Sequence, residues 1–163
     1  MASIALTITH APWIPERAEN MRLLRELKGG ADFYCEETER CPNWVWSENQ
    51  WRKSVETGAD YHLFIQDDLR VAPNFWQTLR AMLTAVPNEV VCLYNGHPAT
   101  KTLAREGYVW CTTADGLVGM GYVFPRELLQ EFITWRTFAL KPNAVEHITE
   151  DTLIDVWCVA MGR

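Results

Sequence analysis

Short apolar segments alternate along this chain with segments of helical periodicity, and this alternation limits the folds that the chain can adopt. The apolar segments are rich in β-branched residues, which is typical of buried strands, whereas the intervening segments repeat apolar residues every three or four positions. Strands that alternate with helices of about 13 residues favour an α/β sandwich. We therefore predict a central, mainly parallel sheet that is flanked by helices.

The predicted elements cover most of the chain. Strands are expected at residues 3–9, 31–35, 61–65, 89–94 and 117–124. Helices are expected at residues 16–28, 43–57, 74–86, 126–138 and 149–161, and a β-hairpin at residues 100–113. Because the chain has 163 residues and neither a linker nor a repeat, we expect a single domain.

Charge and cysteine content narrow the class of protein. The formal net charge is −6 and no basic block is present, which disfavours a protein that wraps nucleic acid but leaves open a nucleic-acid acceptor in a local site. The five cysteines show no CxxC spacing, which indicates reduced thiols in a cytoplasmic protein. We expect neither a signal peptide nor a membrane span, since the chain lacks the apolar runs that both require.

Two adjacent carboxylates, Asp67 and Asp68, follow the strand predicted at residues 61–65. They repel each other by an energy on the order of 1 kcal/mol, which a divalent cation relieves. Mg²⁺ and Mn²⁺ commonly bind through one or two carboxylates together with substrate phosphates. The pair therefore predicts a site for Mn²⁺ or Mg²⁺, and the alternative interpretation is a solvated acidic loop.

Other polar residues lie at the ends of three further predicted strands. Ligands of such sheets bind at the carboxyl ends of the strands, so these residues are expected to share one edge with the carboxylate pair. The residues are Thr9 and His10, Glu36 and Glu37, and Asn95 and Gly96.

Glu150 and Asp151 form a second acidic pair, in the first turn of the last predicted helix. The helix macrodipole favours anions there, and Thr149 can cap the helix. A carboxylate in this place could act as a general base toward an acceptor hydroxyl. The alternative is helix capping alone.

Three stretches, taken in order, resemble a known family. They are FIQDDLRV at residues 64–71, GLVGMGYVFPRELLQEF at residues 116–132 and TEDTLIDVW at residues 149–157. Their order and spacing are similar to those of GT-A-type glycosyltransferases, close to the inverting, family-2-like enzymes. The first resembles the metal-binding DxD-type motif, the second the strand and helix that shape the sugar and acceptor pocket, and the third the Glu-Asp motif that supplies the base.

The resemblance implies a Rossmann-like GT-A sandwich and a single glycosyltransferase domain over residues 1–163. It implies transfer of a sugar from a nucleotide-diphosphate donor, a UDP-sugar, to an acceptor hydroxyl, with inversion and with Mn²⁺ or Mg²⁺ as the cofactor. Asp68 would be the principal metal ligand, Asp67 would support the metal or the donor, and Asp151 would be the base, with Glu150 as the alternative. The acceptor stays open among a glycan, a lipid-linked sugar, a protein and a modified nucleobase.

The resemblance also implies residues that bind the donor. Residues after the first strand would border the nucleotide base, and residues after the second would accept a hydrogen bond from uracil or ribose. Polar residues on the helix before the metal strand would lie near the donor, and one cation among them would meet the diphosphate. In that order, the residues are Thr9 and His10; Glu36 and Glu37; and Asn49, Arg52 and Lys53.

Three features depart from the family pattern. One is the end of the first strand, THAPWIP at residues 9–15, which is not the commonest family form. Gln66 takes the place of the first acidic residue of the motif, which predicts a lower metal affinity. Family members usually continue well past the last helix, whereas this sequence ends at Arg163. A minimal enzyme, a domain truncated at its C-terminus, and a chain whose site is completed on its C-terminal side by a partner chain all fit this pattern.

Two other functions stay open. A non-catalytic or partner-dependent domain that binds a nucleotide or sugar is the second hypothesis, and Gln66 and the early end of the sequence motivate it. A nucleotidyltransferase is the third, and it is disfavoured because residues 9–20 lack a Gly-rich phosphate loop.

Overall fold

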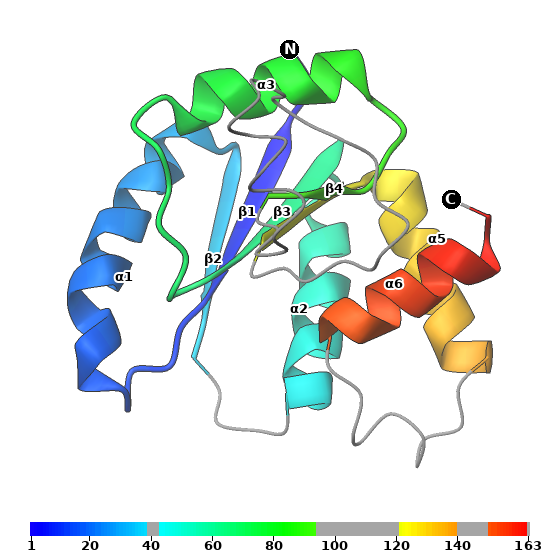
Figure 1. Ribbon diagram of the computed structural model, residues 1–163, viewed down its shortest axis with the longest axis horizontal. Coiled ribbons are helices and arrows are strands. Elements are labelled where there is room, and N and C mark those ends of the chain that lie inside the picture. Colours follow the sequence, from blue (N-terminus) through cyan, green and yellow to red (C-terminus); the bar gives the residue numbers. More distant parts are fainter. Residues whose placement is uncertain (39–42, 94–120, 140–149, 163) are drawn as a thin grey trace, which may run out of the picture.

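Two layers of helices enclose a five-stranded sheet in the computed structural model of this protein (Figure 1). The structure describes residues 1–38, 43–93, 121–139 and 150–162, and the side chains of all of these except residues 43–46, 139, 150 and 151. One face of the sheet is covered by α1 (Ala18–Leu24) and α3 (Phe75–Ala85). The other face is covered by α2 (Asn43–Glu56), α5 (Arg126–Ala139) and α6 (Glu150–Ala160).

The sheet is mixed, with the strand order β2-β1-β3-β5-β4. β1 pairs in parallel with β2 and with β3, whereas β5 pairs antiparallel with β3 and with β4. The prediction of a mainly parallel sheet is therefore wrong, although the α/β sandwich is confirmed. The strands are β1 (Ile4–Thr9), β2 (Phe33–Glu37), β3 (Tyr61–Gln66), β4 (Val91–Cys92) and β5 (Gly121–Pro125).

The direction of β5 follows from where it ends. Pro125 is paired with Tyr61 at the start of β3, and the next residue, Arg126, donates its main-chain N–H to the carbonyl of Asp60 at 3.0 Å. The end of β5 thus lies beside the beginning of β3. Every residue of β5 is buried, and burial alone gives the same sequence pattern for either strand direction, so the sequence could not indicate the reversal.

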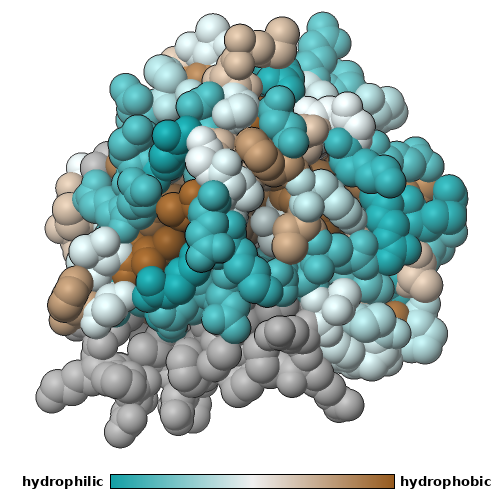
Figure 2. All heavy atoms as spheres, turned by 180° about the vertical axis from the view of Figure 1, so that it is seen from behind, coloured by the Kyte–Doolittle hydropathy of each residue, from teal (hydrophilic) through white to brown (hydrophobic). Residues whose placement is uncertain are grey.

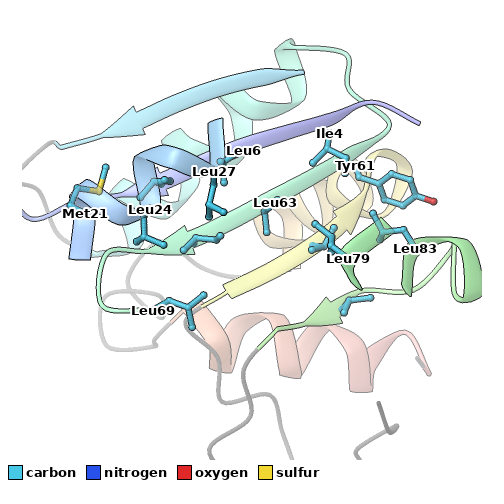
Figure 3. Close-up of a cluster of buried hydrophobic side chains, with 14 residues drawn as sticks. Ile4, Leu6, Met21, Leu24, Leu27, Tyr61, Leu63, Leu69, Leu79 and Leu83 are labelled. Carbon is cyan, nitrogen blue, oxygen red and sulfur yellow. The ribbon is translucent and has the colours of Figure 1, made fainter. Parts of the chain in front are cut away.

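The first hydrophobic core lies between the sheet and the helices α1 and α3. Alternate residues of β1 and β3 point to this face, because side chains along a strand point to opposite faces in turn. Figure 3 shows Leu79 and Leu83 of α3 beside Tyr61, near the start of β3, and Met21 and Leu24 of α1 toward its other end. The helix α1 thereby packs next to the carboxyl ends of β1 and β3.

The second core, on the opposite face, is rich in aromatic rings. Phe132 of α5 lies 4.8 Å from Trp51 of α2, 5.7 Å from Phe124 of β5 and 5.4 Å from Trp157 of α6, measured between ring centroids. Such pairs contribute about 0.5–1.5 kcal/mol each beyond their buried area. These contacts fix α6, whose first turn carries Glu150 and Asp151, against α2 and α5.

Most predicted elements are present, with some changes of boundary. The helix predicted at residues 16–28 is divided into the 3-10 helix η1 (Pro15–Arg17), α1, and a second 3-10 helix, η2 (Arg25–Gly30). β2 begins two residues after its predicted start and includes Glu36 and Glu37, and β4 is limited to Val91–Cys92. The predicted hairpin at residues 100–113, residues 117–120 of the predicted strand, Asn95, Gly96 and Thr149 lie outside the described residues.

Seen from behind, hydrophilic residues dominate the described surface, and hydrophobic residues show through in separate places (Figure 2). Within the part of the chain that the structure describes, no helix is long and apolar enough to cross a membrane.

Gly30, the last residue of η2, lies against the indole of Trp76. This contact predicts that substitutions at Gly30 and at the neighbouring Gly29 differ in their effect on stability. A Cβ at Gly30 would lie 2.3 Å from Nε1 of Trp76, which donates to the Leu27 carbonyl, whereas a Cβ at Gly29 would meet nothing within 4 Å. Gly30→Ala is expected to lower the free energy of unfolding by about 1–3 kcal/mol through overpacking. Gly29→Ala should not lower it, and urea denaturation of both variants measures the difference. Equal losses would contradict the proposed clash.

Candidate functional site

The carboxyl ends of three adjacent strands meet at one edge of the sheet. Thr9, the last residue of β1, is in register with Glu37 of β2 and with Gln66 of β3. The parallel pairing therefore brings the polar residues that follow β1 and β3 next to the acidic end of β2. Ligands of open α/β sheets bind outside such an edge, so this edge is the candidate site.

The carboxylate of Asp67 is buried at this edge, with 1% of the residue exposed. Its Oδ2 accepts the main-chain N–H of Ala11 at 2.8 Å and lies 3.0 Å from Nδ1 of His10. Its Oδ1 accepts from the Arg17 guanidinium at 2.5 Å. Because a carboxylate only accepts, Nδ1 of His10 must carry its ring proton in this contact. We call Asp67 and these three partners the Asp67 hub.

Asn20 of α1 secures the main chain around the same residue. Its Nδ2 donates to the carbonyl of Asp67 at 2.6 Å and to the carbonyl of Leu69 at 2.9 Å. Leu69 is itself buried in the first core (Figure 3). Side-chain donors from α1 and from the loop after β1 thus fix the start of the loop after β3, and Asp68 lies between the two residues whose carbonyls Asn20 binds.

Asp68 presents its carboxylate at the surface. Its side chain is 33% exposed, and its Oδ2 lies 3.2 Å from Nη2 of Arg17. Arg17 therefore bridges the two adjacent carboxylates, and its positive charge offsets the repulsion that we expected a metal ion to relieve. Sequence reasoning missed Arg17 and Asn20. The available signal was their place in a helix that begins right after the loop of the first strand.

The carboxylate pair offers limited room for a metal ion. Both oxygens of Asp67 already accept from protein donors, whereas Asp68 contacts Arg17 through one oxygen. Among the described residues, no group of three or more His, Cys, Asp or Glu side chains could hold a metal ion. Mg²⁺ and Mn²⁺ can bind through a single carboxylate when substrate phosphates supply further oxygens. Of the two carboxylates, Asp68 is therefore the one that could hold a cation, with phosphate oxygens of a substrate as further ligands.

The end of β2 forms a second polar group beside β1. Glu37 is buried and pairs with Lys53 of α2 at 2.9 Å, and it also accepts from Sγ of Cys35 at 3.2 Å. Burial, with a smaller effect of the Glu37 carboxylate, raises the pKa of the Cys35 thiol to about 11. Thr9 donates from Oγ1 to Oε1 of Gln50, also on α2, at 2.8 Å. Both Thr9 and Glu37 thus lie at the edge and have partners on the same helix.

Glu36 faces away from Lys53 and binds a cation on the α1 side. Arg25 donates to it from two nitrogens, at 3.0 and 2.6 Å, and Tyr34 donates to it at 3.1 Å. The hydrogen bonds from Arg25 hold the pKa of the Glu36 carboxyl below its usual value. Because successive residues of a strand point to opposite faces, Glu36 and Glu37 cannot bind one ligand group from the same face.

Asn49 and Arg52, the other two residues of α2 that were predicted to bind the nucleotide-sugar donor, lie in surroundings that differ from those of Lys53. Arg52 pairs with Glu48 at 2.8 Å and donates to Thr137 of α5 at 3.2 Å, so its contacts lie between two helices. Asn49 is partly buried along the same helix. Of the cations considered on α2, Lys53 is the one whose described contact reaches the candidate edge.

Glu150 and Asp151 form the first turn of α6, as predicted, although their side chains are outside the description. Leu153, Ile154 and Trp157 bury the following turns of this helix in the second core. In Figure 1, α6 begins toward the same end of the molecule as the end of β1. The catalytic roles of the two carboxylates stay predictions.

Comparisons with known proteins give little beyond this geometry. Neither a protein-family model nor a curated protein sequence matches the chain. One solved structure that is similar is a glycosyltransferase involved in the glycosylation of the major capsid of PBCV-1. The two share 16% sequence identity with a TM-score of 0.46, over 84% of this chain and 68% of that chain. The function therefore has to be argued from the side chains at the edge of the sheet.

Proposed function

We propose that this protein is a glycosyltransferase that moves a sugar from a nucleotide-diphosphate donor, a UDP-sugar, to an acceptor hydroxyl. The observation that carries the proposal is the pair of adjacent carboxylates at the ends of parallel strands. Asp67 is buried and fixed by protein donors, and it holds Asp68 at the surface, where a ligand of such a sheet would bind. A solvated acidic loop would need no buried network of this kind.

Mn²⁺ or Mg²⁺ is the proposed cofactor, and Asp68 would hold it together with the oxygens of the donor diphosphate. The bound cation would supply Lewis-acid stabilisation for the departing nucleoside diphosphate. The role of the protein's own residues is to position Asp68. The Asp67 hub and Asn20 hold the main chain on both sides of Asp68, so little ordering remains when the donor binds.

The nucleoside would lie along the ends of β1 and β2. Thr9 and His10 would border its base, and Glu37 would accept a hydrogen bond from the base or ribose, since its carboxylate is kept at the edge by Lys53. Glu36 stays in the proposal as the alternative acceptor, although its described contacts are with Arg25 and Tyr34. Asn49 and Arg52 stay in the proposal as weaker candidates for binding the nucleotide-sugar donor. The described contacts of Arg52 are with Glu48 and with α5.

Asp151 is the proposed base that removes the acceptor proton, with Glu150 as the alternative. A single displacement at the anomeric carbon would then invert its configuration. The acceptor class remains a glycan, a lipid-linked sugar, a protein or a modified nucleobase, and we place the reaction in the cytoplasm.

A thermal-shift screen of nucleoside diphosphates, with and without Mn²⁺, tests the donor site. A ligand that binds only the native state raises stability by about 2.7 kcal/mol at a concentration of 100 times its dissociation constant. We expect one nucleotide to stabilise the protein in a Mn²⁺-dependent manner, and Asp68→Asn should abolish the dependence on Mn²⁺. Glu19→Gln, an exposed change on α1, is the matched control that should keep it.

Turnover separates catalysis from binding alone. Asp68→Asn is expected to lower sugar transfer or donor hydrolysis by about 100-fold or more, because a lost transition-state charge contact costs several kcal/mol. Background activity in both the wild-type protein and the variant would sink the enzyme assignment. Mn²⁺-dependent nucleotide binding without turnover would instead support the non-catalytic binding domain.

A further inference from the structure

Arg17 holds the two neighbouring carboxylates with unequal strength. Its Nη1 lies 2.5 Å from Oδ1 of the buried Asp67, and its Nη2 lies 3.2 Å from Oδ2 of Asp68. The side chains of Arg17 and Asp68 are each 33% exposed, whereas that of Asp67 is 1% exposed. One half of the guanidinium is therefore anchored in the protein, and the other half makes a longer, solvent-exposed contact.

The solvent-exposed half can be exchanged at small cost. An ion pair between exposed side chains contributes little, equivalent to a factor of about two to five in an equilibrium constant. A guanidinium carries five N–H donors in a planar fork, and the described contacts of Arg17 use two of them. The fork matches phosphate oxygens in a bidentate manner, which makes a phosphate a stronger partner than a single carboxylate oxygen at 3.2 Å.

We propose that Arg17 is an exchangeable counter-ion of Asp68. When a nucleoside diphosphate enters, the outer half of the guanidinium leaves Asp68 for the diphosphate, while the inner half stays on Asp67. Asp68 then becomes available to a divalent cation. This proposal rests on the proposed function, since it assumes that the same edge binds a diphosphate and a cation. It predicts that the cation and Arg17 compete for Asp68 in the absence of nucleotide.

Arg17→Lys tests the exchange because the proposal expects it to change two affinities in opposite directions, lowering that for nucleotide and raising that for Mn²⁺. The ammonium keeps a positive charge for Asp67 but lacks the fork that reaches two partners. Calorimetric titration with UDP, and with GDP and ADP in parallel, in the absence of divalent cations should show binding about tenfold weaker than in the wild-type protein. Titration with Mn²⁺ alone, followed by the electron paramagnetic resonance of free Mn²⁺, should show binding about two- to fivefold tighter.

Arg22→Lys is the matched control. Arg22 lies on α1, which directly follows η1 with Arg17, and it pairs with the exposed carboxylates of Glu19 and Glu26, so both affinities should equal those of the wild-type protein. Asp68→Asn gives an independent test, because it removes the carboxylate that holds the outer half of the Arg17 guanidinium before a nucleotide binds. Nucleotide binding without a cation should then tighten by about two- to fivefold, and this gain should shrink in the Arg17→Lys background.

The outcomes separate the exchange from the function on which it rests. If Arg17→Lys weakens Mn²⁺ binding as well as nucleotide binding, Arg17 is a fixed structural part of the site and the exchange is wrong. If the variant leaves nucleotide binding unchanged, Arg17 does not meet the diphosphate and the exchange is again wrong. If the wild-type protein binds none of the nucleotides with Mn²⁺ present, the proposed function itself fails.

Discussion

Replacement of Asp67 by alanine is expected to lower the free energy of unfolding by about 3–5 kcal/mol, whereas replacement of the adjacent Asp68 should cost less than about 1 kcal/mol. The two carboxylates are neighbours in sequence but differ in surroundings. Asp67 is 1% exposed and accepts from three protein groups, whereas Asp68 is in contact with solvent and with Arg17. Removal of Asp67 leaves the N–H of Ala11 and the guanidinium without their buried acceptor.

Urea denaturation of Asp67→Ala and Asp68→Ala at pH 7 measures this contrast. Asp67→Asn should fall between the two, because the amide keeps one acceptor oxygen for Ala11 but loses the charge that pairs with Arg17. Equal losses of unfolding free energy in the two alanine variants would show that the buried contacts of Asp67 stabilise the protein no more than the exposed contact between Asp68 and Arg17. The Asp67 hub would then not be a structural unit.

The position of the candidate site could be predicted from the sequence, because it follows from local patterns. A β-branched, buried strand has one carboxyl end, and Asp67 and Asp68 follow the strand β3 immediately. Parallel pairing of β1 with β2 and β3 then brings Thr9, Glu37 and Asp67 to the same edge. The rule that ligands bind at this edge needs no knowledge of side-chain contacts.

The partners of the carboxylates could not be predicted in the same way. Arg17 and Asn20 are about 50 residues from Asp67 in the sequence, and their contacts depend on how α1 packs across the ends of β1 and β3. The expected metal site assumed that nothing else offsets the repulsion between Asp67 and Asp68. A cation supplied by the chain itself satisfies the same electrostatic need, so the motif alone does not distinguish a metal ion from an arginine.

The sequence also does not reveal which cationic residue of α2 lies at the candidate edge. Trp51, Arg52 and Lys53 are consecutive, and consecutive helical residues point in directions about 100° apart. Trp51 is buried against Phe132 of α5, Arg52 bonds to Thr137 of α5, and Lys53 turns toward Glu37 of β2. Once the buried tryptophan is known, the helical period favours Lys53 at the edge, but the sequence does not state which of the tryptophans in this helix is buried.

His62 makes the stability of the protein depend on pH above the range in which carboxylates titrate. It is buried in β3, and its Nδ1 lies 2.8 Å from the Ser54 hydroxyl of α2, whereas its Nε2 has no hydrogen-bond partner among the described residues. Burial, and to a lesser degree the charge of Arg126, lowers the pKa of His62 from 6.5 to about 4. The imidazole is therefore neutral in the folded protein at pH values where it is protonated in the unfolded chain.

Between pH 6.5 and pH 4, the unfolded state consequently binds more protons than the folded state, and stability must fall as the pH falls. The full contribution is present above pH 6.5, and the loss between pH 6.5 and pH 5 is expected to be about 2 kcal/mol. His62→Leu removes the titrating group and should flatten this part of the stability profile. Urea denaturation at half-unit steps from pH 5 to pH 7 measures the slope. Ser54→Ala keeps the imidazole buried and should retain the wild-type slope, whereas an unchanged slope in His62→Leu would assign the pH dependence to another group.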